Sequence, residues 1–120
     1  MTQYFVVAAL LAGCMGESPD RRPPTIDYIA AAILAPSCGR VACHASGTAQ
    51  KGYTFDTVAA SKASIMEQAA AAPGDPGNST LYIVITEDGD KRMPPDGPLP
   101  EADIALIRSW IELGAIGGTP

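Results

Sequence analysis

Two cysteines and a histidine stand close together in the run Ser-Cys-Gly-Arg-Val-Ala-Cys-His, which ends at residue 44. His44 is the only histidine of the chain, and it directly follows Cys43, with Cys38 five positions earlier. In c-type haem attachment, two thiols add to the two vinyl groups of a porphyrin, and the residue after the second thiol reaches the iron. A chain with this arrangement would fold around one large apolar group.

Other uses of these thiols stay open, because four residues separate the cysteines where the usual attachment motif has two. A disulfide between Cys38 and Cys43 in a haem-free domain is one alternative, since an oxidising compartment allows it. A loop so short would gain only modest stability from that bond. A zinc site is disfavoured, because two cysteines and one histidine fall short of the usual four ligands.

The composition suits a small domain with a thin core. The chain has 120 residues, 6% of them aromatic, together with 11 prolines and 12 glycines. A buried apolar cofactor would supply part of the missing core. The net charge of -5 excludes nucleic acid as a partner, because counterion release needs clustered Lys and Arg. An enzyme is not expected either, since the only histidine has no serine and acid partners that suggest a triad.

The amino end has the pattern of an export signal. An apolar run, residues 4–12, is too short to span a bilayer and leads into Leu-Ala-Gly-Cys14, which resembles a bacterial lipobox. We therefore expect residues 1–13 to be a lipoprotein-type signal peptide, Cys14 to be lipidated at a membrane surface, and the product to be exported to the periplasm or cell envelope. A simple secretory signal and an ordinary buried segment remain alternatives, since no Lys or Arg precedes Arg21.

Cysteine counting agrees with a lipidated amino end. Three cysteines leave an odd thiol in an exported protein, whereas lipidation of Cys14 leaves an even pair. Residues 14–24 contain two arginines and three prolines, so they are expected to form an extended tether. The folded domain is then predicted to occupy residues 25–117.

The rest of the chain predicts an all-α domain, because no strand-like alternation is long enough to build a sheet. A first helix should start after Thr25 and run through Ala35, with Pro36 ending it. A second should start at Asp56 or Thr57 and end near Ala71. Residues 79–86 are predicted to be a short helix, although their β-branched content also allows a strand. The last helix should run from about Pro100 to Gly114, with a buried stripe made of Ile104, Ile107, Trp110 and Ile111.

Met93 is the second candidate ligand. It lies in the stretch Lys91–Pro98, which three prolines keep out of a helix. A thioether is a good sixth ligand for haem iron and raises the reduction potential relative to a second histidine. Met66, by contrast, lies in a predicted helix, where methionine usually fills core gaps. Lys91 and Arg92 beside Met93 would contact haem propionates or a partner, or would simply be solvated charges.

Taken together, these features resemble the small c-type cytochromes, in particular the cytochrome domains of exported planctomycete and myxobacterial proteins. The resemblance extends from Cys38 to Gly114 and rests on four landmarks in order: the Cys38 to His44 run, Pro-Gly-Asp-Pro at 73–76 followed by Ser-Thr-Leu at 79–81, Arg-Met-Pro-Pro at 92–95, and a last helix containing Trp-Ile at 110–111 with Gly-Ala at 114–115. The departures are the four-residue spacer and Ala45, where many relatives have glycine.

The resemblance implies a role for each candidate residue. Cys38 and Cys43 would form the haem thioethers, His44 would be the proximal iron ligand and Met93 the distal one. It also implies that the first and last helices pack together at the haem edge. The expected function is transfer of one electron between redox partner proteins. The alternative from another class is a haem-free, disulfide-closed helical lipoprotein with a binding or structural role.

Overall fold

The computed structural model describes residues 18–117, and within this range the secondary structure is entirely helical. The prediction of an all-α domain is therefore confirmed. No helix in this part of the chain is long and apolar enough to cross a membrane. The predicted signal peptide, Cys14 and the first residues of the tether lie outside the described residues. The proposed boundaries of the domain stay a prediction.

The first helical segment is continuous from Ile26 to Ser37. It consists of α1 (Ile26–Ile29), a π-helical stretch (Ala30–Leu34) and α2 (Ala35–Ser37). The predicted cap is confirmed, because the Thr25 hydroxyl accepts a hydrogen bond from the Tyr28 N–H. The helix passes through Pro36 instead of ending before it. The wider π turn, in which the Ala35 N–H reaches the Ala30 carbonyl, comes directly before the residue that lacks a donor.

Helix α3 (Val58–Glu67) begins where the sequence predicts but ends about four residues before Ala71. Thr57 caps it by accepting from the Ala60 N–H at 3.0 Å. The helix ends because Ala69 adopts a left-handed conformation, with a φ of 50°, and the Ala70 N–H turns back to the Ile65 carbonyl. This position usually holds glycine, so an alanine here gives no stop signal in the sequence.

Residues 80–86 form helix α4 (Thr80–Thr86), so the strand alternative is wrong. A short 3-10 turn (Pro76–Asn78) precedes it, in which the Asp75 side chain accepts from the Asn78 N–H. Ser79 is fully buried, and its hydroxyl donates to the Asp75 carbonyl and accepts from the Ala72 N–H. These bonds fix the start of α4 and outweigh the β propensity of its residues.

The last helix, α5 (Glu101–Glu112), is close to its predicted extent. Its buried side chains are Leu106, Ile107, Trp110 and Ile111, while Ile104 is only partly buried. Gly114 follows with a φ of +106°, which ends the helix as expected. Trp110 is 1% exposed, and its indole N–H donates to the Ile116 carbonyl. Trp110 is therefore a core residue.

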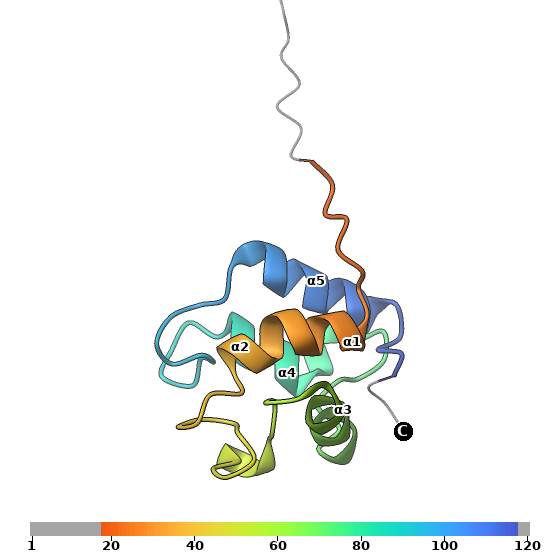
Figure 1. Ribbon diagram of the computed structural model, residues 1–120. Helices are drawn as coiled ribbons and strands as arrows, with labels where there is room; N and C mark the ends of the chain where they lie inside the picture. The colour runs from red at the N-terminus through yellow and green to blue at the C-terminus, as the bar shows by residue number, and fades with distance from the viewer. Residues whose placement is uncertain (1–17, 118–120) are drawn as a thin grey trace, which may run out of the picture.

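In Figure 1, α1 crosses the molecule between α5 on one side and α3 on the other, with α4 behind it. Residues of α1 contact both α3 and α5, and α4 also contacts α5. The predicted packing of the first helix against the last is thus confirmed, whereas its place at a haem edge stays a prediction. The long connections 38–57 and 87–100 leave the same end of this helical core (Figure 1).

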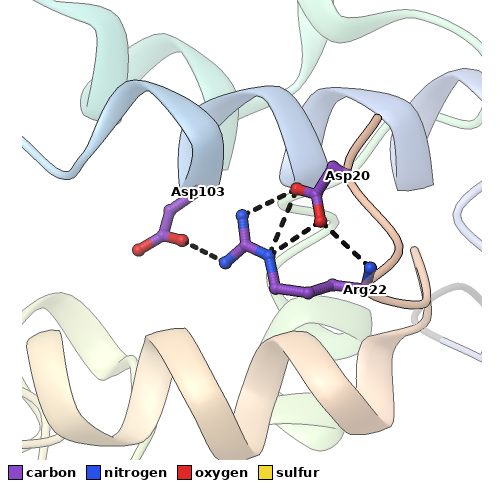
Figure 2. Close-up of polar contacts among 3 residues, drawn as sticks. All are labelled: Asp20, Arg22 and Asp103. Carbon is purple, nitrogen blue, oxygen red and sulfur yellow. Dashed lines mark hydrogen bonds and ion pairs between the residues drawn. The ribbon is translucent and has the colours of Figure 1, made fainter. Parts of the chain in front are cut away.

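An ion-pair cluster fixes the chain just before α1, as Figure 2 shows. The Arg22 guanidinium pairs with Asp20 at 2.8 Å and with Asp103, a residue of the first turn of α5. The hydrogen bond from Arg22 holds the pKa of the Asp20 carboxyl below its ordinary value, and both carboxylates raise the pKa of Arg22. The last residues of the predicted tether therefore follow a defined path along α5.

Candidate cofactor site

Two adjoining cavities, each of about 310 Å³, lie beside the connections 38–57 and 87–100. Each volume is within the range of small-molecule sites. Both cavities are lined by Cys38, His44, Lys51 and Met93. The first is completed by Tyr53, Phe55, Thr80, Leu81, Val84 and Ile85, and the second by Ser37, Ala42, Cys43, Gln50, Pro94 and Pro95. The fold thus brings Cys38, His44 and Met93 to both cavities and Cys43 to the second.

The spacer between the cysteines is a closed turn at the end of the first helix. The Cys38 N–H donates to the Leu34 carbonyl at 2.7 Å, so Cys38 still belongs to the last helical turn. The Cys43 N–H donates to the Arg40 carbonyl, and the His44 N–H returns to the Cys38 carbonyl at 3.1 Å. These bonds close the four-residue spacer into a turn, with Val41 exposed at its tip, and bring Cys43 and His44 back beside Cys38.

Gly39 is required in this turn by a close approach of two backbones. A Cβ atom on Gly39 would lie 2.6 Å from the Phe55 carbonyl oxygen and 2.7 Å from the Asp56 Cα. Gly39 is not in the left-handed region, so conformational freedom is not the reason for a glycine here. Only the absence of a side chain lets the spacer pack against residues 55–56.

His44 is oriented by its contacts with residues 53–55, which lie beside it. Its Nδ1 lies 3.2 Å from the Tyr53 carbonyl oxygen, and its own carbonyl accepts from the Phe55 N–H. Since a carbonyl can only accept, the proton is on Nδ1, which leaves the lone pair of Nε2 free for a metal. The rings of Tyr53 and Phe55 meet the imidazole edge to face, with centroids 6.0 and 5.4 Å away. This is the outer-shell arrangement that prepares a histidine for ligation.

Both cysteines of the motif carry free thiols. Cys38 is buried and faces both cavities, whereas Cys43 is half-buried and faces the second. Burial raises the pKa of the Cys38 thiol to about 11, with a smaller contribution from Cys43. Cys38 is therefore a neutral thiol at physiological pH, and it is largely shielded from solvent.

Met93 lines the same two cavities from the connection 87–100. Its N–H donates to the Val84 carbonyl at 2.8 Å, which ties the loop to α4. Met93 is half-buried and lines both cavities, whereas Met66 lies on α3, is 43% exposed and lines neither. Lys91 and Arg92 line neither cavity, and their contact with propionates, with a partner or with solvent alone stays a prediction.

The residues present fit a haem c. A free imidazole nitrogen, a thioether and two thiols face one space whose other walls are largely apolar, and this donor set suits haem iron. Within residues 18–117, no three His, Cys, Asp or Glu side chains gather as a metal site of another kind. The individual ligand and thioether assignments stay predictions.

Sequence reasoning missed most of the cavity wall. Leu81 and Ile85 are four residues apart and share one face of α4. This spacing indicates a common face only in a helix, and the residue types of this segment also allowed a strand. Tyr53 and Phe55 lie in an irregular segment, where no periodicity indicates burial. Lys51 gave no signal at all. No residue of α5 lines either cavity, so this helix supports the site only through the core.

Comparison with known families gives one match. The family model described as Planctomycete cytochrome C matches residues 41–97. This segment contains Cys43, His44 and Met93, and begins after Cys38. No curated protein and no solved structure matches the chain. The match, together with the helical fold, shows that the chain resembles the planctomycete cytochrome c domain, and this resemblance supports a cytochrome-like role.

Proposed function

We propose that this protein carries one covalently attached haem c and transfers single electrons between redox proteins. Cys38 and Cys43 form the thioethers, His44 is the proximal ligand and Met93 the distal one. The observation that supports this most is that His44 and Met93, far apart in the sequence, line one apolar cavity together with Cys38. The iron of a bound haem supplies the one-electron chemistry.

Each part of the site has a task in this proposal. The Tyr53 carbonyl holds the His44 ring in the tautomer that leaves Nε2 free. Leu81, Val84 and Ile85 from α4 exclude water, and a low dielectric around the iron helps to set its potential. With His44 and Met93 as axial ligands, no position is left for a substrate. The arrangement therefore favours electron transfer over catalysis.

The test is expression of the full chain in a host that matures c-type cytochromes. We expect a coloured protein with a Soret band and a mass raised by one haem, which survives denaturation because the thioethers are covalent. Colourless protein that is lighter by two hydrogens would support the disulfide-closed, haem-free alternative instead. Cys38→Ala and Cys43→Ala should each leave at most one thioether, and the double variant should release its haem on denaturation.

The third cysteine provides a matched control and a prediction of its own. We propose that the protein is exported and lipidated at Cys14, so Cys14→Ala should move it from the membrane fraction to the soluble fraction while leaving the haem in place. The Cys38→Ala/Cys43→Ala variant should do the opposite: it loses covalent haem and stays with the membranes. Immunoblots of the two fractions measure the distribution. An unchanged membrane fraction for Cys14→Ala would contradict lipidation.

The proposed partners are redox proteins that dock briefly near the cavities. Such encounters bury little surface, as electron-transfer complexes generally do. The net charge of -5 favours partners with basic surfaces. Association rates should therefore fall as ionic strength rises.

A further inference from the structure

Lys51 is the most unexpected residue in the cavity walls. It lines both cavities, and among the described residues that line them it alone carries a permanent charge. The side chain is exposed at the edge of an otherwise apolar space. Water can solvate this ammonium, but its place at the edge of the cavities also puts it within reach of a charged group on an occupant.

The backbone around Lys51 is strained. Ala49, Lys51 and Gly52 all have positive φ angles, of 36°, 56° and 80°. Only the glycine adopts such a conformation freely, whereas in alanine and lysine the Cβ atom crowds the following carbonyl oxygen. A lysine at such a position, beside a binding cavity, is the kind of outlier from which a function can be inferred.

The strained turn is built into the cysteine and histidine motif. The Ala49 N–H donates to the Ala45 carbonyl, and the Gln50 N–H donates to the Cys43 carbonyl at 3.1 Å. Two residues after Lys51, the Tyr53 carbonyl binds Nδ1 of His44. Lys51 is thus held between two contacts that also fix Cys43 and His44, so its position follows that of the motif.

We infer that the Lys51 ammonium pairs with a carboxylate of the cavity's occupant, and this rests on the proposed function, in which the carboxylate is a haem propionate. The porphyrin is apolar except for its two propionates, which suits cavities whose walls are largely apolar and carry one lysine. Other nearby cations are less suitable: Arg40 pairs with Asp96 at 3.2 Å and, like Lys91 and Arg92, lines neither cavity.

Resonance Raman spectra of the covalent haem protein test this pairing directly, because the propionate bending band shifts when a propionate loses a charged partner. Lys51→Ala should shift the band, and Lys51→Arg should restore it. Lys91→Ala is the matched control, since it removes an equal charge from an exposed lysine outside both cavities. An unshifted band in Lys51→Ala, or an equal shift in Lys91→Ala, would overturn the inference.

A comparison of two variants separates the charge from the backbone strain. Lys51→Gly and Lys51→Ala both remove the ammonium, so both should shift the propionate band alike. Lys51→Gly also relieves the positive φ, so it should melt above Lys51→Ala by about 4 °C. If the band follows the melting temperature and not the charge, Lys51 only shapes the turn and the inference fails.

Porphyrin dissociation gives a second measurement that does not depend on the Raman band. The full-length Cys38→Ala/Cys43→Ala variant is reconstituted with iron protoporphyrin or its dimethyl ester, and transfer to apomyoglobin is timed. Adding Lys51→Ala should speed loss of the free acid about two- to fivefold, as expected for one partly exposed ion pair, and should leave the ester unchanged. If Lys51→Ala sped loss of the free acid and of the ester equally, the pairing would be overturned, although haem binding itself would not be. A wild-type chain that matures without haem would overturn the proposed function first, and the inference with it.

Discussion

Replacing Gly39 with alanine is expected to lower the free energy of unfolding by about 3 kcal/mol, at the upper end of the usual cost of overpacking. The new Cβ would lie 2.6–2.7 Å from backbone atoms of Phe55 and Asp56. Backbone atoms cannot move aside as a flexible side chain would, so the spacer must shift as a whole. For a domain of this size, the melting temperature should fall by roughly 10–20 °C.

The same change should also impair the site. The Cys38 and His44 backbones are joined by a hydrogen bond across this turn, and the Phe55 N–H binds the His44 carbonyl. A shift of the spacer away from residues 55–56 would separate these groups, so we expect a lower yield of covalent haem. Thermal melts and the ratio of Soret to protein absorbance measure the two effects.

Gly47 is the matched control for Gly39, because it lies in the same connection and an added Cβ there would meet nothing within 4 Å. Gly47 is also outside the left-handed region. Gly47→Ala should therefore change stability by no more than about 0.5 kcal/mol. If the two variants melted together, the close approach at Gly39 would not be the constraint that we infer.

Replacing Met93 with alanine should abolish the weak near-infrared band from sulfur to iron and lower the reduction potential on the order of 100 mV, a modest part of the range that axial ligands cover. The thioether stabilises the reduced iron, and its loss opens the sixth position to water. The backbone bond from residue 93 to the Val84 carbonyl does not need the side chain, so the loop should keep its path. Optical spectra and potentiometric titration measure the change.

Met66→Ala is the control for this prediction. Met66 is 43% exposed on α3 and lines neither cavity, so the band and the potential should both remain as in the wild type. Covalent haem should be retained in both variants, because neither residue forms a thioether in our proposal. Survival of the band in Met93→Ala would exclude Met93 as the distal ligand.

The sequence predicted the local features of the fold well. Thr25 and Thr57 cap helices at the expected positions, and Gly114 ends the last one. Each of these signals acts within a few residues, through a side-chain oxygen or a permitted φ angle. The Cys38 to His44 run and Met93 could also be selected as candidates, because their chemistry is visible in the residue types.

Signals that depend on distant packing were missed or misread. The end of α3 at Ala69 has no glycine to mark it, and α4 is a helix because Ser79 and Asp75 fix its start. The fold brings Lys51 to the cavities through a turn in which Ala49 and Lys51 have positive φ angles, a conformation that neither residue type indicates.

The type of fold and the chemical groups of the site can be predicted from the residues alone, because helix caps, apolar stripes and ligand types are properties of short segments. How the four-residue spacer is accommodated depends instead on a contact between distant segments. Gly39 lies against the backbone of residues 55–56, which are close in space but not in sequence. That contact, together with the hydrogen bond from the His44 N–H to the Cys38 carbonyl, keeps the motif closed, so that Cys38, Cys43 and His44 lie at the same pair of cavities as Met93.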